Sequence, residues 1–196
     1  MPGNKKKMII ATSAVTAFAV LSVLIFFVAV PYFKNRDDGS VRAQASDEYA
    51  ALLSDNGIPD APHGFKGLKS TSYAVTTGGD SFETIELGSK KDTVTEMYDT
   101  VYFSVVGMTD EEYARFTEEL RNRCEAVANE SYCTYSAEKQ GEMYVLTMHF
   151  YALDKPQNVR DLITLGIISN YSSKDSDTVS LTDTETSLLK MGFTKR

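Results

Sequence analysis

The segment Thr93–Ser104 reads TVTEMYDTVYFS, and residues 109–127 after it read TDEEYARFTEELRNRCEAV. The first segment is rich in β-branched and aromatic residues and has no helical period, so it predicts a strand. Thr109 and Glu112 have the spacing of a capping box, in which each side chain satisfies a backbone amide of the other residue. The pattern therefore predicts a strand followed directly by a well-capped helix.

Apolar residues in the predicted helix recur at helical spacing. Tyr113, Phe116, Leu120 and Val127 share one side of such a helix, and charged residues occupy the rest. An amphipathic helix of this kind covers the apolar face of a sheet.

Two hairpins are predicted on either side of this unit. Residues 73–77 and 82–87 are joined by Gly78-Gly79-Asp80, and residues 132–137 and 142–151 by Lys139-Gln140-Gly141. In the last strand, alternation directs four side chains toward the core: Tyr144, Leu146, Met148 and Phe150. Val145, Thr147, His149 and Tyr151 lie on its other face.

Two shorter helices complete the predicted fold. One follows Pro156, with Val159, Leu162, Ile163 and Ile167 as its apolar residues. The other begins at a second capping box, Thr182-x-x-Glu185, continues through Leu188 and Leu189, and stops at Gly192. The predicted class is α+β: an antiparallel β-sheet with one long helix and one or two shorter helices packed on it, preceded by a single N-terminal transmembrane helix.

The N-terminal part predicts a membrane anchor. Residues 8–33 are 26 consecutive uncharged, mainly apolar residues, whereas a helix needs roughly 20 to cross a bilayer. Lys5, Lys6 and Lys7 precede the span and favour a cytoplasmic N-terminus. The expected order is a cytoplasmic basic head (1–7), a transmembrane signal anchor (8–33), a tether with room for one short helix (34–70) and an extracytoplasmic α+β domain (71–196).

A cleaved signal peptide is the alternative to the anchor. Ala43-Gln44-Ala45 has the small-x-small pattern of a cleavage site. The apolar run is longer than that of a signal peptide, however, and the site lies well beyond its end. The uncleaved anchor is therefore the favoured interpretation.

Charge is divided unevenly along the chain. The residues after the apolar span contain 17 basic and 27 acidic side chains, a net charge of −10. Nucleic-acid binding depends on basic side chains that neutralise phosphates, so this acidic domain is not expected to bind nucleic acid.

Catalytic motifs are absent from the sequence, which contains neither G-x-S-x-G, a P-loop, G-x-G-x-x-G nor H-E-x-x-H. His63 and His149 are the only histidines, so we expect no metal site, no cofactor and no enzymatic activity. The alternative is an envelope hydrolase that uses paired carboxylates, for instance Glu83 with Glu96 on neighbouring strands.

Two further sets of residues are candidates. Cys124 and Cys133, the only cysteines, fall in the part expected outside the membrane, where such a pair tends to oxidise to a disulfide; two free, partly buried thiols are the alternative. Tyr98, Tyr102 and Tyr151 are candidates for an exposed aromatic binding surface, with packing inside the sheet as the alternative.

The elements from residue 91 onward resemble the YehR-like bacterial lipoproteins. The resemblance covers KDTVTEMYDTVYFS, the following helix, the second hairpin and the C-terminal S-L-T-x-T-E-x-x-L-L-K-x-G-F at residues 180–193. It implies a small α+β fold outside the cytoplasmic membrane, without established enzymatic activity and without transferable catalytic residues. Members of the family are typically anchored through a lipid-modified cysteine, whereas this sequence has the apolar span.

These observations predict a membrane-anchored extracytoplasmic binding or interaction module. Its expected contacts are the membrane, through the N-terminal helix, and an envelope protein or a cell-wall component.

Overall fold

The computed structural model describes residues 63–76, 81–165 and 177–196. In this part of the chain, seven strands form one sheet, and three helices accompany it. The elements are β1 (Lys69–Thr76), β2 (Ser81–Lys90), β3 (Thr93–Ser104), α4 (Asp110–Glu130), β4 (Cys133–Gln140), β5 (Met143–Phe150), α5 (Pro156–Thr164), β6 (Val179–Ser180), α6 (Leu181–Lys190) and β7 (Thr194–Lys195). The predicted α+β class is confirmed.

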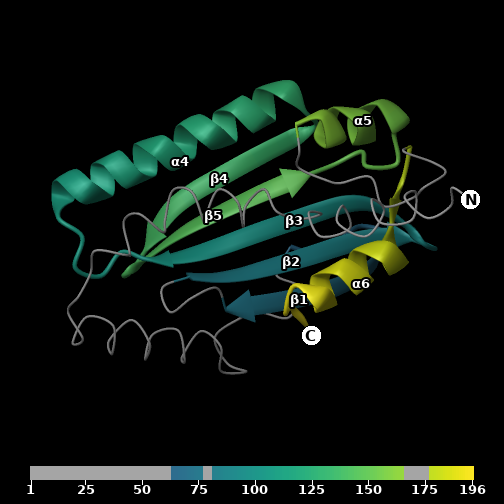
Figure 1. Cartoon of the computed structure of the whole chain (residues 1–196), viewed down its shortest axis with the longest axis horizontal. Coiled ribbons are helices and arrows are strands. Elements are labelled where there is room, and N and C mark those ends of the chain that lie inside the picture. The colour runs from purple at the N-terminus through teal and green to yellow at the C-terminus, as the bar shows by residue number, and fades with distance from the viewer. Residues whose placement is uncertain (1–62, 77–80, 166–176) are drawn as a thin grey trace, which may run out of the picture.

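The strands are arranged in the order β4-β5-β3-β2-β1-β7, and the short β6 pairs with β3. Every pairing is antiparallel. Figure 1 shows α4 running along β4, with α6 near β1 and β2. The three helices contribute Phe116, Leu120, Leu162 and Leu188 to one buried cluster with one face of the sheet, which we call the helix face.

Predicted strands match the observed ones. β3 has the expected limits, and both hairpins are present. The strands β1, β2 and β4 are longer than expected, whereas β5 is one residue shorter at each end. Lys139 and Gln140, which we expected in the second connection, belong to β4 and pair with β5. Tyr144, Leu146, Met148 and Phe150 of β5 are buried in the core cluster, as the alternation predicted. The other face of the sheet, which we call the second face, carries Tyr98, Thr100 and Tyr102 of β3 and Val145, Thr147 and His149 of β5.

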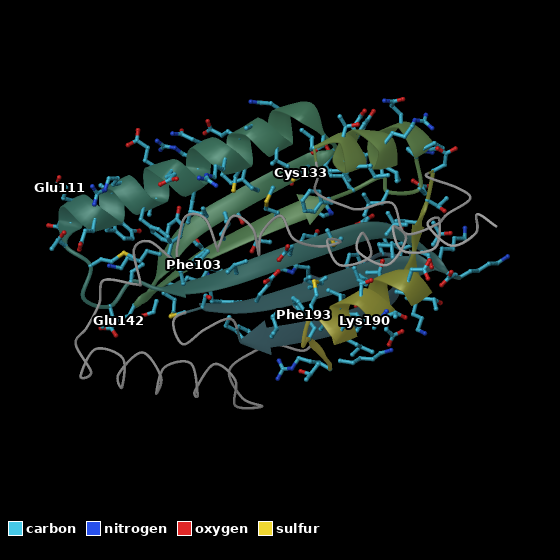
Figure 2. All side chains as sticks on the ribbon, viewed as in Figure 1. Phe103, Glu111, Cys133, Glu142, Lys190 and Phe193 are labelled. Carbon is cyan, nitrogen blue, oxygen red and sulfur yellow. The ribbon has the colours of Figure 1, made fainter. Side chains whose placement is uncertain are left out.

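Helix α4 begins with the predicted capping box. The backbone amide of Glu112 donates to Thr109 Oγ1 over 3.3 Å, and the amide of Thr109 donates to Glu112 Oε2 over 2.9 Å. Phe116 and Leu120 are buried, and Tyr113 and Val127 pack at the margin of the core. Figure 2 shows Glu111 at the N-terminal end of this helix, directed away from the sheet.

Helix α6 corrects one prediction, because the expected capping box at Thr182 and Glu185 does not form. The helix begins at Leu181, and its N-cap is Ser180, whose hydroxyl accepts from the amide of Asp183. Thr182 is bound instead by Asp92 of the β2–β3 turn, which accepts from the Thr182 amide over 2.9 Å and from its hydroxyl over 2.7 Å. Glu185 forms an ion pair with Lys195. A side chain 90 residues away thus binds the first turn of the helix, whose N-cap is the local residue Ser180.

Replacing Asp92 with alanine is expected to lower the free energy of unfolding by about 1 kcal/mol, the usual cost of losing a helix cap. Hydrogen bonds from Thr182 hold the pKa of Asp92 below its usual range. The stabilisation by Asp92 is therefore fully present above the ordinary carboxyl pKa and is lost as the pH falls through the lowered pKa of Asp92 in the folded domain. Denaturant titrations at pH 7 and at pH 3 check this, with Glu118→Ala on the exposed side of α4 as the control. Equal losses at both pH values would contradict it.

Several predicted features lie outside the described residues. They include the apolar span at 8–33, most of the tether, the Gly78-Gly79-Asp80 connection and Ile167. Among the helices that are described, none is long and apolar enough to cross a membrane. β1 begins at Lys69, inside the segment that we expected to be tether.

Candidate functional site

Neighbouring strands bring the polar and aromatic residues of the second face into rows. The register places Tyr98 of β3 between Glu86 of β2 and His149 of β5, and Thr134 of β4 lies opposite His149. Side chains directly opposite each other on paired strands are close enough to interact. The row therefore crosses four strands, from Glu86 to Thr134.

Three aromatic rings stack along this row. The ring centroids of His63 and Tyr98 are 4.1 Å apart with planes 7° from parallel, and Tyr98 and His149 have the same spacing and angle. Tyr98 is thus enclosed between two imidazoles. We call these three residues, His63, Tyr98 and His149, the ring row.

His63 reaches the row from the chain that precedes β1. Its Nδ1 lies 2.8 Å from Glu86 Oε1, and its backbone amide donates to Glu86 Oε2 over 3.4 Å. Phe65 packs tilted against Tyr98 and lies over Gly88, where a Cβ atom would come within 2.5 Å of the phenyl ring. Gly88 has no side chain, so the entering chain can lie flat on the second face.

Two tyrosines extend the aromatic surface beyond His149. Tyr151 lies 5.6 Å from the His149 ring, and Tyr132 meets Tyr151 edge to face at 5.8 Å. Asn158 of α5 fixes this corner, because its Nδ2 donates to the Tyr151 carbonyl and its Oδ1 accepts from the Tyr132 amide. Tyr132 is 49% exposed, so the surface ends in an accessible ring.

Acidic groups accompany the rings. Glu86 is buried under His63, and the half-exposed Glu96 has its Oε2 3.5 Å from His149 Nε2. Burial raises the pKa of Tyr98 above its ordinary value, and the charges of Glu96 and Glu86 raise it further. Tyr98 is therefore a neutral phenol at physiological pH, and the surface combines neutral rings with carboxylates.

The structure separates the three predicted aromatic surface residues into two groups. Tyr98 and Tyr151 both contact His149, so they belong to one surface. Tyr102 lies further along β3 and packs against Phe82 in a small second cluster. All three are partly buried rather than fully exposed.

Both histidines have a larger part in this surface than the sequence suggested. His63 falls in the segment that we expected to be tether, and His149 was placed on the face of its strand away from the core, but both stack on Tyr98. The alternation in β5 puts His149 and Tyr151 on one face, which was the available signal for His149. Nothing local indicates His63, since its partner Glu86 is 23 residues away.

The carboxylate pair nominated for a hydrolase is not brought together. Glu83 lies on the helix face, fully buried and opposite Val101, whereas Glu96 lies on the second face. Glu83 instead neighbours Asp99, which occupies the diagonal position on β3. Within the described residues, no three His, Cys, Asp or Glu side chains are grouped as metal ligands.

The expected disulfide between Cys124 and Cys133 is absent, and both cysteines are free and buried. Figure 2 shows Cys133 at the start of β4, beside α4. Burial raises the pKa of each thiol to about 12, and the carboxyl group of Asp99 adds to both shifts. Each side chain packs as a small apolar group of the core, with little of the thiolate that oxidation requires.

Native protein at pH 8 is therefore expected to leave both thiols unmodified by iodoacetamide. In guanidinium chloride without a reductant, both should react, which mass spectrometry detects as two carbamidomethyl groups. Protein unfolded without a reductant that takes up no label would contain a disulfide and would contradict the prediction.

Comparison with known proteins identifies a shared fold. Neither a family model nor a curated protein matches the chain. The solved structure of Escherichia coli YehR is similar over 66% of this chain and 92% of its own, with a TM-score of 0.51 and 15% identity. A protein from Streptococcus pneumoniae TIGR4 is similar over 71% of this chain and 90% of its own, with a TM-score of 0.44 and 13% identity. The described domain therefore has a YehR-like fold.

Proposed function

We propose that this chain is a membrane-anchored interaction module on the extracytoplasmic side of the cell membrane. It is a single-pass protein, held by the apolar segment 8–33, with its N-terminus in the cytoplasm. Its partner is a component of the cell envelope, either a protein or a cell-wall component. It binds no nucleic acid and carries no catalytic activity.

The aromatic surface at the end of the ring row is the observation that carries this proposal. His149, Tyr151 and Tyr132 lie together, and their arrangement is fixed by stacking and by the hydrogen bonds of Asn158. Tyrosine rings that are partly buried and end at the surface are enriched in interfaces, because they offer contact area at a small entropic cost. A preorganised aromatic surface supports binding more directly than it supports catalysis.

The chain is, in this proposal, a relative of the YehR-like lipoproteins in which a transmembrane helix replaces the lipid-modified cysteine. The shared fold and the C-terminal sequence pattern support this relation. The difference changes the anchor and keeps the domain on the same side of the membrane.

Site-specific crosslinking in intact cells tests the binding surface. A photoreactive amino acid in place of Tyr132 is expected to give a crosslinked adduct. The same amino acid in place of Glu118, on the exposed side of α4, is the matched control and should give none. Adducts of equal yield from both positions, or none from position 132, would exclude this surface.

Protease treatment tests the topology. Added to intact cells whose outer layers are permeabilised, protease is expected to degrade the domain and to leave cytoplasmic proteins intact. If the domain becomes sensitive to protease only after lysis, it lies in the cytoplasm, and the proposal is wrong.

A further inference from the structure

Among the described residues, Tyr98 is the only ring that stacks parallel on His149, since Tyr151 lies 5.6 Å away and is tilted by 46°. His149 has one face against Tyr98, on the side of β3, so its other face is turned toward β4. The residue of β4 opposite His149 is Thr134, which is small and exposed. Neighbouring strands lie about 4.8 Å apart, so a planar group above Thr134 would lie at stacking distance from His149.

This position lies at an edge of the described sheet. β4 pairs only with β5 in the part of the chain that the structure describes. Ser136 and Glu138 lie on the same side of β4 as Thr134, and both are exposed, whereas Tyr135 and Ala137 between them face the core and are partly buried. A side chain of another protein can therefore reach the position from the edge without displacing part of the described fold.

Shape and charge together define the occupant. The row stacks with planes only 7° from parallel, so it continues best with a flat group. Glu96 lies beside His149, Glu138 lies further along β4, and the residues after the apolar span have a net charge of −10, so the flat group should be a cation. Guanidinium is planar and cationic, stacks on aromatic faces and donates up to five hydrogen bonds. The hydroxyl groups of Thr134, Ser136 and Tyr132 can accept them.

We infer that the end of the ring row binds the guanidinium group of an arginine side chain from a partner protein. The inference rests on the proposed function and narrows the partner to a protein that presents an exposed arginine. The guanidinium lies over Thr134, against the outer face of His149, with Tyr132 and Tyr151 beside it.

Binding of small probes tests the chemistry. The full chain in a non-ionic detergent is titrated with N-acetylarginine amide and with its citrulline and lysine counterparts, followed by NMR. Citrulline is flat but neutral, and lysine is charged but not flat. Arginine is expected to bind at least threefold more tightly than either, with the largest shifts at Thr134, His149 and Tyr132. Equal affinity for all three probes, binding elsewhere on the chain, or no binding overturns the inference.

Two variants of one residue test the position. Thr134→Phe places a ring of the chain itself over His149 and is expected to abolish arginine binding. Thr134→Val keeps the size and the strand propensity and removes only one hydroxyl acceptor, so it is expected to weaken arginine binding by no more than about fivefold. Unchanged arginine binding by T134F would overturn the inference.

The same variants separate this inference from the proposed function. If T134F still gives the crosslinked adduct from position 132, the surface binds a partner, but the partner does not bind through an arginine over Thr134. If position 132 gives no adduct in the chain that keeps Thr134, the proposed function itself is wrong, regardless of how the small probes bind.

Discussion

Replacing Asp99 with asparagine is expected to remove the part of the pH dependence of stability that Asp99 contributes above the ordinary carboxyl pKa. Asp99 is 4% exposed, and Glu83 beside it on β2 is fully buried. Burial raises the pKa of Asp99 well above its usual range, and the charge of Glu83 and a hydrogen bond with it raise it further. The folded domain therefore holds the proton of Asp99 more tightly than the unfolded chain does.

The sign of the effect follows from proton binding. Above the ordinary carboxyl pKa the unfolded chain has released the proton of Asp99, whereas the folded domain retains it. The free energy of unfolding then falls by about 1.4 kcal/mol for each pH unit until the pH passes the raised pKa. Asparagine has nearly the same shape and can donate to Glu83 without binding a proton, so the variant lacks this slope.

Denaturant titrations of both proteins between pH 5 and pH 8 measure the difference. Asp154→Asn, at an exposed position in the loop after β5, is the matched control and should retain the slope. A D99N protein with the same pH dependence as the unchanged protein would show that the folded domain does not retain the proton of Asp99 in this pH range.

Replacing Phe116 with alanine is expected to cost about 3–5 kcal/mol of stability, a large part of the total for a domain of this size. Phe116 is fully buried and holds α4 on the helix face. Its ring meets Phe103 edge to face at 5.4 Å and Tyr144 at 5.9 Å. Alanine would leave a cavity between the helix and two strands.

Thermal and denaturant unfolding of Phe116→Ala measures this loss. Glu118→Ala, two residues away on the exposed side of the same helix, controls for helix propensity and should change stability by less than about 0.5 kcal/mol. A loss below about 1 kcal/mol in F116A would mean that α4 contributes little to the core.

Local patterns were sufficient to predict most elements of the fold. The limits of β3, the capping box of α4 and the inward side chains of β5 depend on residues a few positions apart, so they can be read from spacing. The side chain that binds Thr182 in the first turn of α6 is Asp92, which is 90 residues away. A contact between residues so far apart in the chain leaves no signal in the local sequence. The spacing of Thr182 and Glu185 therefore predicted a capping box that does not form.

The candidate site was predictable only in part, for a related reason. Alternation assigns Tyr98 and Tyr151 to a face of their strands, but the order β2-β3-β5-β4 decides which side chains become neighbours. That order brings His149 beside Tyr98. The register of β2 and β3 places Glu83 next to Asp99 and puts Glu83 and Glu96 on opposite faces of the sheet. Spacing along the chain does not specify the order of strands, so both the ring row and the buried acid pair were missed.

The contact between Asp92 and α6 also has a kinetic consequence. The β2–β3 hairpin is local and can form early, whereas the hydrogen bonds from Thr182 and Ser180 to Asp92 close loops of about 90 residues. The first turn of α6 therefore acquires these hydrogen bonds only after the intervening strands and helices are in place. We expect Asp92→Ala to accelerate unfolding and to leave the refolding rate nearly unchanged, so that this aspartate governs how long the native state persists rather than how quickly it is reached.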